Sequence, residues 1–141
     1  MKLLDGVRVL DLTNVLAGPF ATMHLALAGA DVIKIENPEG GDLARKLGNV
    51  PTLNQELMGT SFLAQNANKR SLTLNLKLDE GREIFRRLAV EADVVVENFR
   101  PGVMTRLGVA ATTRASFYLY SIPEEVERLV AGLHKVKASL G

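Results

Sequence analysis

The sequence of 141 residues contains no cysteine, which excludes disulfides, thiolate metal sites and a cysteine nucleophile. It also has no tryptophan and only 5% aromatic residues, so its core must rest on Leu, Val, Ile and Ala. The sequence has almost no excess of charge of either sign, since 17 basic residues balance 16 acidic ones and the formal net charge is +1. Nucleic-acid binders usually carry a strong basic excess. We therefore expect no nucleic-acid partner.

Long hydrophobic runs are missing as well. The longest apolar stretch, 18–30, is interrupted by Thr22 and His24 and is shorter than the roughly 20 residues that span a bilayer. Residues 1–6 reach a charged side chain before any long apolar segment, unlike a secretory signal. We therefore expect no membrane association and a cytoplasmic location. Neither HxxxH nor EF-hand spacing occurs, so we also predict no metal.

Segments typical of strands alternate with segments typical of helices, and hydrophobic residues make up 47% of the chain. This order predicts an α/β fold, in which helices flank a Rossmann-like, open and mainly parallel sheet. Region 37–68 is the least regular, with a short helix predicted over 42–47. Strands are predicted over 7–12, 31–36, 71–76, 93–97 and 115–120, and further helices over 19–28, 78–92, 102–107 and from 123 onward.

Local features add expectations about burial and capping. The helix over 19–28 is apolar almost all round, so we expect it to be well buried, with His24 as a core histidine. The segment 93–97, with its continuous apolar run at 94–96, is typical of a buried parallel strand. Ser121 and Glu124 match a capping box at the start of the final helix.

Open α/β sheets bind ligands beyond the carboxyl ends of their strands, here at residues 13–18, 36–38 and 97–101. The first of these loops precedes a helix, whose N-terminus favours an anion, although a simple tight turn is the alternative. Basic residues suit phosphates, or else form a solvated surface: Arg45, Lys69, Arg70, Arg100 and Arg106. Glu36, Asp42 and Glu97 are candidates for an acid/base group, although nothing in their spacing brings them together.

A series of motifs over about the first 108 residues resembles the class III CoA-transferase family, which includes formyl-CoA transferase and α-methylacyl-CoA racemase. No single motif is decisive, but their order and spacing are specific. The matching segments are LDGVRVLD at 4–11, AGP at 17–19, GADVIKIE at 29–36, GD at 41–42, NKRS at 68–71, NLK at 75–77, ADVVVENFRPG at 92–102 and LG at 107–108.

This resemblance implies a CoA site at the carboxyl edge of the sheet. It implies that Val15, Leu16 and Ala17 line the adenine and pantetheine side, and that Leu74 and Leu76 pack on the nucleotide. Asn98 and Phe99 then contact the pantetheine arm, and Arg106 meets phosphate. Two departures stand in the same site: Asn14 where some transferases carry His, and Asn37 where an Arg often holds CoA. The family's nucleophilic aspartate lies beyond the matching region, so no residue is assigned a catalytic role.

The tail, 109–141, departs from this pattern. Its segments 111–120 and 123–130 are similar to the extreme C-terminus of a group II cysteine desulfurase, a pyridoxal phosphate enzyme. That resemblance implies that Arg114 is the arginine that holds the substrate carboxylate. The pyridoxal lysine and the catalytic cysteine of the desulfurase have no counterpart here, so we expect no pyridoxal phosphate.

We therefore interpret the chain as a chimera of two enzyme fragments. Residues 1–108 form a CoA-transferase-like half-domain, and 109–141 add a strand and a helix packed on the same domain. Three hypotheses stay open: a CoA or acyl-CoA binding module without turnover, a CoA-transferase completed by another chain, and a folded chimera without activity. Both families form homodimers, so we expect a homo-oligomer.

Overall fold

The computed structural model describes residues 2–109 and 122–140. The chain divides into two compact units, Met1–Ala110 and Ala111–Gly141, and each is described by itself. The first unit holds the sheet and every candidate CoA residue, whereas the second holds one helix among its described residues.

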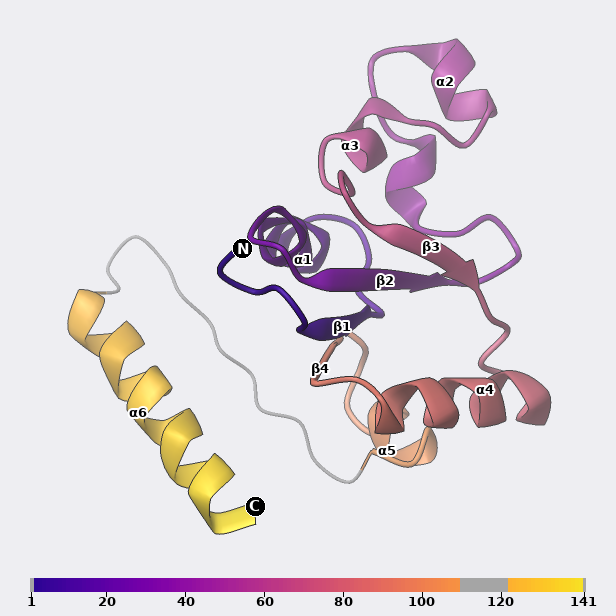
Figure 1. Ribbon diagram of the computed structural model, residues 1–141. Coiled ribbons are helices and arrows are strands. Elements are labelled where there is room, and N and C mark those ends of the chain that lie inside the picture. Colours follow the sequence, from indigo (N-terminus) through magenta and orange to yellow (C-terminus); the bar gives the residue numbers. More distant parts are fainter. Residues whose placement is uncertain (1, 110–121, 141) are drawn as a thin grey trace. The chain divides into compact units, whose positions relative to one another are not determined.

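The first unit is built on a parallel sheet of four strands (Figure 1). The strands are β1 (Arg8–Asp11), β2 (Asp31–Glu36), β3 (Arg70–Thr73) and β4 (Val94–Val96), in the order β3-β2-β1-β4. Leu10 lies opposite Ile33 of β2 and Val95 of β4, so β1 and β2 form the middle of the sheet. The predicted α/β fold with a parallel sheet is confirmed. The further strand predicted over 115–120 lies outside the described residues.

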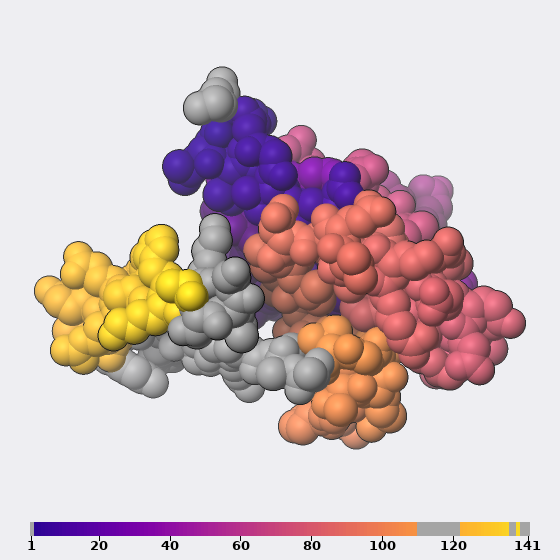
Figure 2. All heavy atoms as spheres, turned by 60° about the horizontal axis from the view of Figure 1, so that its bottom comes forward, coloured from indigo at the N-terminus to yellow at the C-terminus, as the bar shows by residue number. Residues whose placement is uncertain are grey.

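Helices cover both sides of the sheet (Figure 1). One side carries α1 (Ala17–Leu27), and we call it the α1 face. The other carries α4 (Asp79–Val90) and α5 (Val103–Arg106), which Figure 2 shows at the surface, and we call it the α4 face. The irregular region contains η1, a 3₁₀ helix over Leu43–Lys46, and the short helices α2 (Pro51–Gln55) and α3 (Thr60–Leu63).

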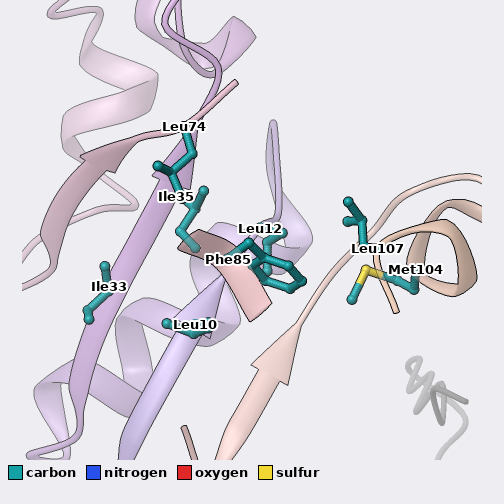
Figure 3. Close-up of a cluster of buried hydrophobic side chains, with 8 residues drawn as sticks. All are labelled: Leu10, Leu12, Ile33, Ile35, Leu74, Phe85, Met104 and Leu107. Atoms are coloured by element: carbon teal, nitrogen blue, oxygen red, sulfur yellow. The ribbon is translucent and has the colours of Figure 1, made fainter. Parts of the chain in front are cut away.

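Because side chains alternate along a strand, neighbouring residues of β1 and β2 enter different cores. The larger core lies on the α4 face, where Phe85 of α4 is fully buried (Figure 3). Its buried members are Leu10, Leu12, Ile33, Ile35, Leu74, Phe85, Met104 and Leu107. The smaller core lies on the α1 face and joins Val9 and Val32 to Ala26 and Ala30.

Two expectations about burial are wrong. In α1, Phe20 and Leu27 are 50% and 52% exposed. His24 is exposed as well and meets the Phe20 ring edge-on at 4.5 Å, so it is not a core histidine. In β4, Val94 is 40% exposed because this strand lies at the edge of the sheet and is covered less than β1 and β2.

The second unit contains α6 (Pro123–Leu140). Glu124 and Glu125 lie in its first turn, where carboxylates interact favourably with the helix dipole. The Ile122 N–H donates to Glu125 Oε2 at 3.2 Å, whereas the predicted cap Ser121 lies outside the described residues. None of the helices in the described ranges is long and apolar enough to cross a membrane.

Candidate functional site

A cavity of about 520 Å³ opens where β1, β2 and β3 end. Its position follows from the parallel sheet, whose strand ends gather loops of different segments at one edge. The end of β2, the chain after β3, the loop after β4 and helix α5 all contribute. The lining residues are Leu12, Asn14, Ile35, Glu36, Asn37, Gly41, Leu74, Asn75, Leu76, Lys77, Arg82, Phe99, Val103, Arg106 and Leu107.

The cavity has an apolar floor. Leu12, Ile35, Leu74 and Leu107 line it and at the same time belong to the core of the α4 face (Figure 3). The floor is therefore fixed by the packing of the sheet against α4 and α5. A ligand on this floor would find apolar contact that requires little rearrangement of the protein.

Cationic side chains lie at the same cavity. The Arg82 guanidinium donates to the Lys77 carbonyl at 2.8 Å and pairs with Asp79, so it is already engaged. Lys77 and Arg106 are exposed and form no ion pair with any carboxylate in residues 2–109 and 122–140. Those two charges are thus available to an anionic group of a ligand.

The structure brings only part of the predicted site together. Asn37, Leu74, Leu76, Phe99 and Arg106 line the cavity. The others, Val15, Leu16, Ala17 and Asn98, do not line it.

Asn98 contacts the backbone of Asn14, which lines the cavity. Asn98 Oδ1 accepts from the Asn14 N–H at 3.0 Å, and Asn98 Nδ2 donates to the Asn14 carbonyl at 2.8 Å. Its side chain thus holds a neighbouring loop in this structure.

Charged residues are buried on the α1 face, directly across the sheet from the cavity floor. Lys69 Nζ lies 2.9 Å from Asp11, Lys34 Nζ 3.0 Å from Asp42, and Arg45 2.7 Å from Glu36. The interpretation of Lys69 and Arg45 as phosphate ligands therefore does not hold here, because both cations pair with carboxylates.

Of the other residues considered for the site, Glu36 lines the cavity, whereas Arg70, Arg100, Asp42 and Glu97 do not. Arg70 forms a bidentate pair with Asp31, and Arg100 does not line the cavity. Glu36 and Asp42 do meet, since the Asp42 N–H donates to Glu36 Oε1 at 2.9 Å. Glu97 instead accepts from the Phe99 N–H at 2.6 Å, so no group of three carboxylates forms. Within the described ranges no cluster of His, Asp and Glu fit to hold a metal ion occurs either.

The family model of CoA-transferase family III matches residues 4–117. The chain belongs to CoA-transferase family III. The match ends inside the segment 109–141, which the sequence motifs alone assign to a separate tail.

Curated relatives agree with this family. The mouse succinyl-CoA:glutarate CoA-transferase is 50% identical over 109 residues, which cover 77% of this chain and 24% of the relative. A succinyl-CoA:mesaconate CoA-transferase from Haloarcula marismortui is 54% identical, with coverage of 75% and 27%. A formyl-CoA:oxalate CoA-transferase from Rhodopseudomonas palustris is 48% identical, with coverage of 76% and 24%. The chain thus spans about a quarter of the length of these relatives.

Solved structures match the fold as well. A hypothetical protein from Mycobacterium tuberculosis is 44% identical, with a TM-score of 0.69 and coverage of 79% of this chain and 29% of the other. A CAIB/BAIF family protein from Brucella suis is 41% identical, with a TM-score of 0.68 and coverage of 78% and 29%. The open parallel sheet is therefore shared with these proteins.

Several lining residues of this family III chain were not among the residues predicted from the sequence. Lys77 and Arg82 flank the start of α4, and Val103 and Leu107 lie next to Arg106 along α5. The helical spacing of α5 carried a usable signal, because Val103 lies one turn before the predicted Arg106. Asn14 and Glu36 also line the cavity, and the sequence had already drawn attention to both. The missed residues are Leu12, Ile35, Gly41, Asn75, Lys77, Arg82, Val103 and Leu107.

The buried pairs shift the pKa values of their members. Burial alone would raise the pKa of Asp11, but the Lys34 charge and hydrogen bonds from Thr13, Thr22 and Lys69 outweigh it and hold that pKa below its usual value. Burial likewise opposes the effect on Glu36, whose pKa is nevertheless lowered by the Arg45 guanidinium and the Asp42 N–H. Both carboxylates are therefore ionised at neutral pH.

Proposed function

We propose that the unit Met1–Ala110 binds CoA or an acyl-CoA in the cavity at the carboxyl edge of the sheet. The observation that carries this proposal is the apolar floor beside two cations, Lys77 and Arg106, that no described carboxylate neutralises. CoA combines an adenine and a pantetheine arm with several phosphates, so it needs both kinds of surface. A volume of about 520 Å³ also lies within the usual range of small-molecule sites.

In this proposal different lining residues contact different parts of the ligand. Leu74 and Leu76 pack on the nucleotide, Phe99 contacts the pantetheine arm, and Arg106 and Lys77 meet phosphate. Asn37 supplies an amide at the end of β2, where it contributes hydrogen bonds but no charge.

The remaining candidates take places beside the cavity. Val15, Leu16 and Ala17 follow Asn14 and are exposed, so they are open to a long ligand that extends past the cavity. Asn98 acts on the ligand through the Asn14 backbone that it holds.

The reaction of the relatives is proposed only for a more complete protein. The resemblance puts the nucleophilic aspartate beyond the matching region, and we assign no catalytic residue in this chain. A CoA-transferase completed by another chain is the second candidate, because the chain spans about a quarter of relatives that their names describe as CoA-transferases. Mass spectrometry after addition of acyl-CoA tests it, since turnover requires a covalent enzyme–CoA thioester. Its repeated absence would count against this candidate.

No residue of the proposed site is assigned to the tail. We propose that 109–141 derives from a cysteine desulfurase, that the chain is a chimera without pyridoxal phosphate, and that it forms a cytoplasmic homo-oligomer. The alternative without a ligand is a folded chimera that has no biochemical activity. This alternative predicts a cooperative melting transition that CoA does not shift.

Isothermal titration of the full chain with CoA tests the proposed site. The wild type should give saturable heat, whereas Leu76→Trp should lose it because the larger side chain fills the cavity from its wall. Leu63→Trp is the matched control, since Leu63 is exposed and does not line the cavity. No heat at millimolar CoA with a folded sample would overturn the proposal, and equal binding by Leu76→Trp would move the ligand away from this cavity.

A further inference from the structure

Val15 has an unfavourable backbone conformation. Its φ is 75°, in the left-handed region, where a β-branched residue is an outlier. Such conformations persist only where the surrounding structure over-determines them, and they gather at functional sites. Val15 follows Asn14, which lines the cavity, and its side chain is 43% exposed. The strain is therefore not explained by burial of the Val15 side chain.

Side chains from other segments hold the loop of residues 13–15. The N–H groups of Asn14 and Val15 donate to Asn98 Oδ1 and Asp42 Oδ1, each at 3.0 Å. The Thr13 N–H donates to Asp11 at 2.9 Å, and the Thr13 carbonyl accepts from Lys34 Nζ at 2.8 Å. Successive peptide groups are thus fixed by separate parts of the sequence.

Asp42 takes part in two of these contacts, one directly and one through Lys34, and it is fully buried. Its Oδ1 accepts from the N–H groups of Val15 and Ala44, and its Oδ2 lies 3.0 Å from Lys34 Nζ. Lys34 in turn donates to the Thr13 carbonyl, so one ion pair holds the loop on both sides of Asn14. The cap of η1 and the edge of the cavity therefore share one carboxylate.

We propose that Asp42, backed by Lys34, is a positioning residue that keeps Val15 in its left-handed conformation and thereby fixes Asn14 at the edge of the cavity. Asp42 itself does not line the cavity. Its effect on a ligand passes through the loop backbone, and that part of the inference rests on the proposed CoA site.

A double-mutant cycle with Val15→Gly distinguishes positioning from general support of the fold. Glycine adopts a positive φ without the steric penalty, so it removes the need for a residue that enforces it. Asp42→Ala should weaken CoA binding about tenfold in the wild-type background, but less than about threefold in the Val15→Gly background. Equal losses in both backgrounds would show that Asp42 only supports the fold and would overturn the proposal.

Asp42→Asn is the conservative variant for the same cycle and keeps the side-chain volume if Asp42→Ala does not fold. Its amide oxygen can still accept from the Val15 N–H, but it no longer balances the Lys34 charge. We expect about a threefold loss of CoA affinity in the wild-type background and none in the Val15→Gly background. A loss that is the same in both backgrounds again overturns the inference.

Hydrogen exchange of the ligand-free chain separates this inference from the proposed function. The Val15 amide should exchange about tenfold faster in Asp42→Ala than in the wild type. The Leu12 amide, which donates to the Val96 carbonyl at 2.8 Å, is the reference and should not change. A changed Val15 amide in a chain that binds no CoA would defeat the proposed function and keep the positioning role. An unchanged Val15 amide would overturn the positioning role whatever CoA does.

Discussion

The two faces of the sheet bury different kinds of side chain from the same strands. On the α4 face, Leu10, Ile33 and Ile35 join an entirely apolar core. On the α1 face, β2 contributes Val32 near its start but Lys34 and Glu36 near its end, and all three are buried. The α1 face is thus apolar near the amino ends of the strands and charged near their carboxyl ends.

This difference indicates a division of tasks at the carboxyl edge. Buried ion pairs contribute little net stability, because removing two charges from water costs about as much as their attraction returns. They do specify geometry, and here they hold the loops after β1 and β2. The α4 face is left free to form an apolar cavity floor, while the α1 face fixes the loops that border it.

The largest expected loss of stability comes from a substitution in the apolar core of the α4 face. Phe85→Ala removes a fully buried ring from the core of the α4 face and should lower the free energy of unfolding by about 3–5 kcal/mol. Urea denaturation followed by circular dichroism measures it. Val90→Ala on the same helix is the control, because Val90 is 86% exposed and its loss should change stability by less than about 0.5 kcal/mol. Similar effects of the two variants would contradict the packing described for this face.

Removing a buried ion pair from the α1 face should cause a slightly smaller loss of stability. Lys69→Met leaves the buried Asp11 carboxylate without its ion-pair partner and should cost about 3 kcal/mol in the same assay, since Thr13 and Thr22 still donate to Asp11. Lys46→Met is the matched control on an exposed lysine and should be nearly neutral. A neutral Lys69→Met would mean that the α1 face does not depend on its charges.

The frame of the fold could be predicted from the sequence because it depends on local patterns. The described strands β1, β2, β3 and β4 and helices α1, α4, α5 and α6 all overlap predicted segments, since apolar spacing reports which residues face a core. The same rule failed for the exposed side of α1, because an apolar residue can remain at the surface and composition does not show what covers it.

The charged side could not be predicted from local patterns. Lys69 and Asp11 lie 58 residues apart in the sequence, and their pairing depends on how β3 is placed beside β2. Lys34 and Glu36 alternate with apolar residues in β2, which is also typical of a strand with one solvated face. Candidate site residues such as Leu74 and Leu76 came from the resemblance, while Lys77 required the three-dimensional arrangement.

Lowering the pH should destabilise the fold through the buried carboxylates of the α1 face. Asp11 and Glu36 have lowered pKa values in the folded chain, so their contribution to stability is present above the usual carboxyl range near pH 4 and is lost as the pH falls through the lower folded values. The urea midpoint should therefore drop between about pH 5 and pH 2. Glu36→Gln should show a shallower drop than the wild type. An identical slope in this variant would remove Glu36 from the explanation.

The smallest expected effect concerns the cations at the cavity, which in our proposal bind a ligand and do not stabilise the fold. Lys77→Ala and Arg106→Ala should each weaken CoA binding about fivefold, or about 1 kcal/mol, because both cations are exposed and screened by solvent. Their unfolding free energy should stay within about 0.5 kcal/mol of the wild type. Arg87→Ala is the control, since Arg87 is exposed on α4 but does not line the cavity.

If the charges of Lys77 and Arg106 act on phosphate, raising the salt concentration must reduce the difference in CoA affinity between the variants and the wild type. A difference in CoA affinity that salt does not alter would mean that Lys77 and Arg106 contact the ligand by packing. The cavity would then hold no charges that serve the ligand, in contrast to the structural charges of the α1 face.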